Sequence, residues 1–62
     1  MNGLDKLKSG DFNDMNQRWL PDGTVIITLI KRSEGIVYKF RVKDLYGENE
    51  QEVDIDTGEP IP

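Results

Sequence analysis

The sequence predicts a small all-β domain, an antiparallel four-stranded meander that is strongly curled or closed into an SH3-like barrel. Residues 24–43 contain ten hydrophobic side chains, nearly all β-branched or aromatic, in two runs separated by a tight turn. The chain contains no alanine, and stretches that favour helix are scarce, so the ambiguous segments are expected to be strands as well. Sequential hairpins are the simplest way to connect such strands.

The chain has 62 residues and is expected to form one domain, with residues 1–13 as an arm or short helix and residues 57–62 as a tail. A chain of this length builds only a small core, and small scaffolds commonly add disulfides, a structural metal or a second copy. Cysteine and histidine are both absent, so disulfides are excluded and a zinc site lacks its usual ligands. The remaining ways to stabilise so small a domain are a sheet closed on itself and self-association.

The first strand is expected at residues 15–20. Residues 20–24 read LPDGT, a turn pattern in which proline presets φ, aspartate bonds to the local backbone and glycine takes the left-handed conformation. A hydrophobic run follows this turn, so a strand is expected before it. This arrangement places Trp19 or Leu20 over the core, and we expect the tryptophan to anchor it.

The second and third strands are expected at residues 24–32 and 36–43, joined by a turn at residues 33–35 in which Gly35 supplies a positive φ. Hydrophobic and polar residues alternate in the third strand, so its lysines and Arg41 are expected on a solvated face. The second strand is hydrophobic on both faces, which is typical of a central strand that is covered twice. Its second face therefore needs a cover from the N-terminal segment, from curling of the sheet, or from a partner.

The fourth strand is expected at residues 51–56. Residues 24–43 carry five basic side chains and one acidic one, whereas residues 44–62 carry seven acidic side chains and no basic one. If the last two strands pair with Val42 near Val53, the basic stripe of one faces the acidic stripe of the other. The expected cross-strand pairs are Lys43 with Glu52, Arg41 with Asp54, and Lys39 with Asp56.

The residue types argue against catalysis. Histidine and cysteine, the commonest general base and the best thiol nucleophile, are absent. The six glycines are spaced as turn residues rather than as a phosphate-binding loop. Residues 54–59 match only part of a calcium loop. We therefore expect no enzyme, no metal site and no cofactor.

The favoured interpretation is a non-catalytic protein-binding module, either an adaptor or an inhibitor of a larger protein. The doubly hydrophobic second strand favours an interface, with a different protein or with a second copy in a homo-oligomer. Tyrosine is enriched at binding hot spots, and charged residues of the last two strands flank the loop that carries it. The candidate binding residues are Lys39, Arg41, Lys43, Tyr46, Glu52 and Asp54.

Two alternatives involve nucleic acid. The basic hairpin at residues 31–43 is a candidate phosphate-binding surface, although the net charge of −4 argues against it. Acidic residues at 48–59 would stand about 6.5–7 Å apart along an exposed strand and could act as a decoy for a nucleic-acid enzyme. A charged edge strand that resists aggregation explains the same pattern more simply.

Cytoplasmic location is the expectation from the remaining features. No run approaches the roughly 18 apolar residues of a membrane span, and residues 1–10 lack a signal-peptide pattern. The lack of cysteine is compatible with a reducing compartment.

Overall fold

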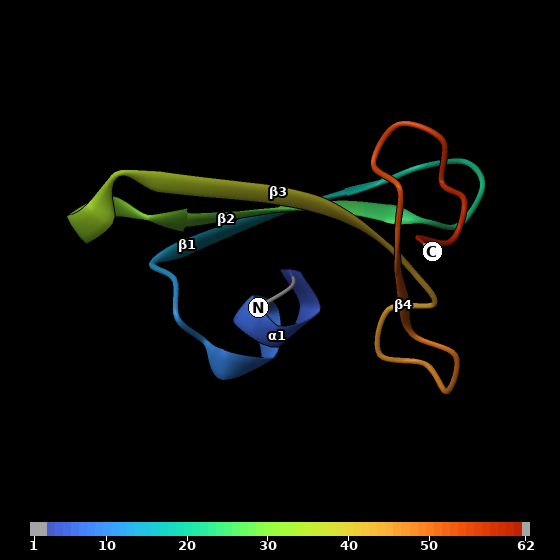
Figure 1. Ribbon diagram of the computed structural model, residues 1–62, viewed down its shortest axis with the longest axis horizontal. Coiled ribbons are helices and arrows are strands. Elements are labelled where there is room, and N and C mark those ends of the chain that lie inside the picture. The colour runs from blue at the N-terminus through green and yellow to red at the C-terminus, as the bar shows by residue number, and fades with distance from the viewer. Residues whose placement is uncertain (1–2, 62) are drawn as a thin grey trace.

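The computed structural model describes residues 3–61, which form one short helix and a four-stranded antiparallel sheet (Figure 1). In chain order the elements are α1 (Gly3–Ser9), β1 (Asp14–Trp19), β2 (Val25–Lys31), the 3-10 helix η1 (Arg32–Glu34), β3 (Ile36–Lys43) and β4 (Gln51–Val53). Strands that are neighbours in the chain are neighbours in the sheet, so the predicted meander is confirmed. The sheet is not closed, because β1 and β4 lie at opposite edges, and the SH3-like barrel is not confirmed.

Of the two alternatives for residues 1–13, an arm or a short helix, the structure has the helix as α1; residues 1–2 and residue 62 of the predicted tail lie outside the described range. Seven residues are too few for a stable isolated helix, so α1 depends on packing. Its Leu7 is buried in the core, and Gly3 lies so close to the Phe40 ring that a Cβ would overlap it. With this length, α1 falls far short of a membrane span, and the described chain holds no other α-helix that could serve as one.

The hairpin of β1 and β2 turns at residues 20–24 as predicted. Asp22 Oδ1 accepts the Thr24 backbone N–H at 2.9 Å and the Thr24 hydroxyl at 2.6 Å. Gly23 has a φ of 88°, in the left-handed region. The local bonds of the aspartate and the conformation of the glycine are the two features that this turn pattern specifies, and both are confirmed.

β2 and β3 pair along their whole length and form the core. Cross-strand partners on the core face are Val25 with Val42, Ile27 with Phe40, and Leu29 with Tyr38. The connection is η1, followed by Gly35 with a φ of 65°, the positive φ expected for this glycine. Figure 1 shows α1 beneath one face of the sheet, and Leu7 and Phe12 belong to the cluster that covers the core residues.

β4 differs from the prediction in both length and register. It ends at Val53 rather than at residue 56, and it places Val53 opposite Arg41. A slip of one residue moves every side chain to the other face of the sheet. The predicted pairs of Lys43 with Glu52, Arg41 with Asp54, and Lys39 with Asp56 are therefore wrong.

Two acidic side chains explain the observed register of β4. Glu52 lies opposite Val42, on the core side, where its Oε1 accepts the N–H groups of Gly3 at 2.9 Å and of Leu4 at 3.3 Å. Asp54 Oδ1 accepts the next backbone N–H groups, at residues 56 and 57, at distances of 2.9 and 3.0 Å. The first interaction fixes which way the strand faces, and the second turns the chain away after Val53.

Trp19 lies on the surface with 58 % of its area exposed, so the prediction that it anchors the core is wrong. It stands opposite Val25, on the side of the sheet that carries α1. Because α1 packs mainly against β3, it does not extend over the β1 margin of that side. Leu7 and Phe12 fill the core in place of the indole.

Candidate functional site

Arg41 is an internal cross-link rather than a surface charge. Its side chain is only 8 % exposed, so the prediction that it lies on a solvated face is wrong. Nε donates to Thr24 Oγ1 at 2.8 Å, Nη2 to Asp22 Oδ2 at 2.6 Å and Nη1 to Ile55 O at 3.3 Å. The guanidinium thus joins β3 to the β1–β2 turn and to the C-terminal segment.

Asp22 is held in its charged form by the same network. Hydrogen bonds from the Thr24 hydroxyl and from the Thr24 backbone N–H are the largest causes that lower the pKa of its carboxyl, and Arg41 lowers that pKa further. Gly58 closes over the guanidinium, where a Cβ would stand 2.9 Å from Nη2 of Arg41. The polar groups around Arg41 are therefore used within the chain.

Lys39 and Lys43 are exposed at different places on β3. Lys39 lies near the middle of the strand, and Lys43 lies at its end, beside an open depression that Asp22 and Asp44 also line. Neither ammonium group has a hydrogen-bond or ion-pair partner among residues 3–61. Of the three predicted basic residues, these two are available to a ligand.

Tyr46 is 70 % exposed, as expected for a contact residue, and its role in binding stays a prediction. It has a φ of 63°, an uncommon conformation for a bulky side chain. Its N–H donates to Glu50 Oε2 at 2.6 Å, while Glu50 Oε1 lies 2.5 Å from Lys8 Nζ. The bond from Lys8 is the main cause that lowers the pKa of Glu50. The backbone that carries the exposed phenol of Tyr46 is therefore held in place by Glu50 and Lys8.

Glu52 and Asp54, the two predicted acidic binding residues, are engaged in local structure. Glu52 caps the start of α1 through the two backbone bonds described above. The pKa of Asp54 lies below its usual range, chiefly because the backbone N–H groups of Thr57 and Asp56 donate to it. These interactions do not bring the two acids together with Lys39, so the six predicted residues do not form one site.

The side of the sheet away from α1 is uncovered at its centre, and we call it the open face. Figure 1 shows no helix or strand above it, and the C-terminal segment crosses only one end. Val37 is 65 % exposed there, and its cross-strand partner Ile30 is partly buried. The open face comprises Asp14, Asn16 and Arg18 from β1, Ile26, Thr28 and Ile30 from β2, and Val37 and Lys39 from β3. Asp14 forms an ion pair with Arg32.

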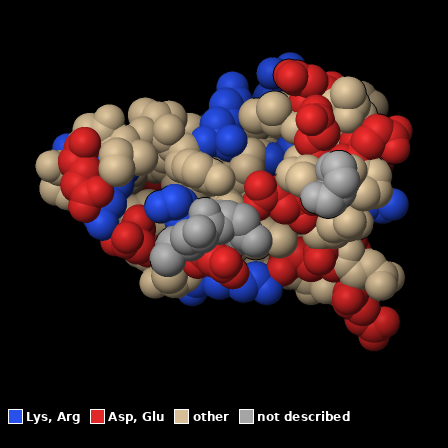
Figure 2. Space-filling model, in the orientation of Figure 1, with Lys and Arg blue, Asp and Glu red and all other residues tan. Residues whose placement is uncertain are grey.

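The open face matches the sequence prediction that the second face of β2 needs a cover. Within residues 3–61 neither α1 nor curling of the sheet supplies it. In Figure 2 basic atoms stand among uncharged atoms along the upper border, on this side of the sheet, whereas many acidic groups gather at the right. The charged groups of the open face that have no ion-pair partner among residues 3–61 are the basic Arg18 and Lys39, in a chain of net charge −4.

The edge of β1 is a second uncovered region, which was not predicted from the sequence. Met15 and Trp19 are large exposed hydrophobic residues on this strand, with Gln17 between them on the same side. A usable signal was present: residues 14–19 read DMNQRW, with hydrophobic residues only at the second and sixth positions. A strand so poor in hydrophobic residues is typical of a sheet edge rather than of a buried position.

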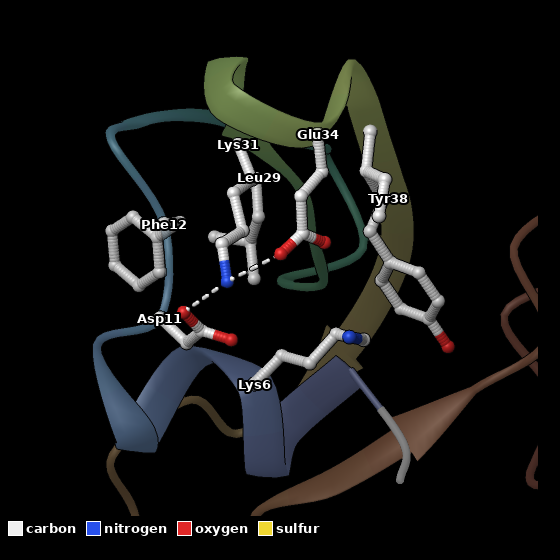
Figure 3. A pocket seen from close by; sticks show the side chains of 8 residues that line it. Lys6, Asp11, Phe12, Leu29, Lys31, Glu34 and Tyr38 are labelled. Atoms are coloured by element: carbon white, nitrogen blue, oxygen red, sulfur yellow. Dashed lines mark hydrogen bonds and ion pairs between the residues drawn. The ribbon is translucent and has the colours of Figure 1, made fainter.

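A small, partly enclosed cavity lies between α1 and η1, lined by several charged side chains (Figure 3). Lys31 Nζ lies 2.6 Å from Asp11 and 3.2 Å from Glu34, and the bond from Asp11 is the main cause that raises the pKa of Lys31. Lys6 Nζ stands 5.5 Å from the centre of the Tyr38 ring. A volume of about 40 Å³ holds a water molecule or two, not a substrate.

The described residues also offer no metal centre, since no group of three or more acidic, histidine or cysteine side chains converges among them. Comparison with known protein families, curated proteins and solved structures found no match. Function is therefore inferred from the open face.

Proposed function

We propose that the protein is a non-catalytic protein-binding module whose open face docks onto a partner that presents apolar side chains flanked by carboxylates. The observation that supports this is Val37, exposed at the η1 end of a sheet face on which Ile26 and Ile30 are only partly covered. Arg18 and Lys39 stand beside this apolar strip. Exposed apolar patches with a polar rim commonly mark interfaces.

The chemistry of the open face sets the character of the partner. Full burial of one aliphatic side chain contributes roughly 1.5–3 kcal/mol, and the partly covered isoleucines contribute less. Lys39 has no partner of its own among the described residues, so a carboxylate on the docked protein would find an unused cation. Such charges chiefly speed encounter and select the partner.

A nucleic-acid partner is supported less well by the same surface. Sheets that bind single strands stack bases on aromatic side chains, and the open face contains none. Tyr38 lies on the core side, paired with Leu29, and Tyr46 lies in the β3–β4 loop. The acidic decoy is disfavoured because β4 ends at Val53 and Glu52 is used to cap α1.

Location in the cytoplasm remains part of the proposal, supported by the absence of cysteine. An adaptor and an inhibitor would use the same docking surface, so the choice between them depends on the partner.

Affinity capture from a cell lysate tests the proposal when matched variants are compared. Val37→Asp and Lys39→Glu change the open face, and Ile61→Asp makes a comparable change at another exposed hydrophobic residue. We expect a protein partner whose purified form binds the wild type and Ile61→Asp equally. Its affinity for each open-face variant should fall about tenfold or more, the scale of one central contact.

Equal binding of every captured protein to all variants would overturn the proposal. A single-stranded oligonucleotide that binds at low salt and is lost with Lys39→Glu would replace it with the nucleic-acid alternative.

A further inference from the structure

The outer edge of β1 carries a row of backbone groups that have no partner among residues 3–61. The Leu20 N–H donates to Thr24 O at 2.8 Å, so Leu20 faces β2. Hydrogen-bonded positions recur at every second residue of an antiparallel ladder, so Arg18 and Asn16 also face β2. The N–H and C=O groups of Met15, Gln17 and Trp19 therefore point away from the sheet.

The row is bounded at both ends. The Asn13 N–H donates to Ile30 O at 2.7 Å and is not available. Pro21 follows Leu20 and has no N–H to offer. Three consecutive outward positions, at residues 15, 17 and 19, are thus free to pair with another strand.

The opposite edge of the sheet offers a shorter row, because β4 pairs only with residues 41–43 of β3 and leaves the outward backbone groups of Val37 and Lys39 without another strand of the described chain beside them. β4 has three residues, Val53 forms a bridge with Pro60, and Asp54 turns the chain away. Short strands, turns and charges are the usual means of protecting a sheet edge from pairing. β1 is twice as long, with no proline or lysine in it, so it is the less protected edge.

We propose that two copies of this chain pair antiparallel through β1, about a two-fold axis that passes midway between the Gln17 residues of the two copies. This register places Gln17 opposite the partner's Gln17 and Met15 opposite the partner's Trp19. All three outward positions of each copy then form hydrogen-bonded pairs. The thioether of Met15 lies against the partner's indole, a favourable sulfur–aromatic contact, and the two exposed hydrophobic side chains cover each other.

In the neighbouring registers, fewer of the outward backbone N–H and C=O groups of β1 find a hydrogen-bond partner. A shift in one direction sets Arg18 opposite the partner's Arg18, where like charges repel, and Met15 opposite a proline. A shift in the other direction sets Trp19 opposite Asn13, whose N–H is already used by Ile30. In the proposed register Arg18 instead faces the partner's Asn16.

The pairing joins two four-stranded sheets into one of eight strands. The two-fold axis is perpendicular to the sheet, so both open faces lie on one side and both α1 helices on the other. The dimer therefore presents two open faces side by side. The hydrogen bonds that join the two copies come from Met15, Gln17 and Trp19, none of which belongs to the open face, so dimerisation can succeed or fail independently of the proposed function.

Single cysteines test the register, because the natural chain contains none. Paired positions in the proposed ladder have Cα atoms about 5.5 Å apart, within the range of a disulfide. We expect Gln17→Cys to form a covalent dimer on mild oxidation. Met15→Cys alone should not form one, whereas an equimolar mixture of Met15→Cys with Trp19→Cys should. Tyr46→Cys, exposed on another surface, is the background control.

Sedimentation of the wild type over a rising concentration series is the second measurement. We expect a monomer–dimer equilibrium, a parallel blue shift in the fluorescence of the single tryptophan, and at least tenfold weaker association for Gln17→Pro, which removes an outward N–H. A wild-type chain that stays monomeric at every concentration would overturn the proposal. Cross-linking of Gln17→Cys no faster than of Tyr46→Cys would overturn it as well.

Discussion

Nη2 of Arg41 lies 2.6 Å from Oδ2 of Asp22 and joins the centre of the sheet to the β1–β2 turn. The same guanidinium also holds the C-terminal segment through Ile55 O. That segment has few hydrophobic contacts of its own, since its Ile61 is exposed. One buried cation therefore positions parts of the chain that hydrophobic packing leaves loosely placed.

Replacement of Arg41 by lysine should destabilise the fold by about 1–3 kcal/mol, the cost of leaving buried partners unsatisfied. Lysine keeps the charge but cannot reach Thr24, Asp22 and Ile55 together. Urea unfolding measures the loss. Lys39→Arg is the matched control, because Lys39 is exposed and has no partner among residues 3–61. Its free energy of unfolding should change by less than about 0.5 kcal/mol. Equal midpoints for the two variants would contradict the structural role of Arg41.

Stability should fall as the pH drops below about 4, the usual pKa of an unfolded aspartate. The folded pKa of Asp22 is depressed, chiefly by the Thr24 hydroxyl and backbone N–H. Its contribution is therefore present above the unfolded pKa and is lost as the pH falls through the folded value. Thermal unfolding across pH 2–7 measures this loss.

Asp22→Asn is the control for the acid transition. The amide does not titrate, so this variant should start less stable at neutral pH and should lose less stability on acidification. A parallel pH profile for the wild type and the variant would show that other carboxylates, such as Asp54, account for the acid sensitivity.

Glu52→Ala should loosen α1 and cost about 1 kcal/mol, the typical value of an N-terminal cap. The Glu52 carboxylate accepts hydrogen bonds from two N–H groups at the start of the helix. Its negative charge also interacts favourably with the positive end of the helix dipole. Hydrogen exchange at the amides of α1 should accelerate in this variant. Glu48→Ala, in the exposed β3–β4 loop, should leave both exchange and stability unchanged.

Local patterns were sufficient to predict the central hairpin and its turns. Residues 20–24 carry their own hydrogen-bonding and φ preferences, and the hydrophobic runs on either side of Gly35 define strands at almost the observed positions. The second hydrophobic face of β2 was also visible, because alternation fails there. These features depend on residues close together in the chain.

The register of β4 could not be obtained in this way. Alternation of Val53 and Ile55 predicts that both point to the core, but the interaction that sets the register joins Glu52 to Gly3, 49 residues away. The burial of Arg41 has a similar origin, since its partners lie in a turn and in the C-terminal segment. Sequence spacing carries no information on such distant polar contacts.

Trp19 is a residue type that usually lies in the core, but here it is largely exposed. Its removal should therefore have little effect on the stability of the monomer. The indole is largely exposed because α1 packs mainly on β3, so Trp19→Ala at low concentration should change the free energy of unfolding by less than about 1 kcal/mol. Ile27 is fully buried, and Ile27→Val should cost about 0.5–1.5 kcal/mol although it removes a single methylene. Circular dichroism during urea unfolding compares the two without relying on tryptophan fluorescence. If Trp19→Ala lowered the free energy of unfolding by several kcal/mol, the indole would have to be buried in the core. That result would contradict the exposed edge on β1.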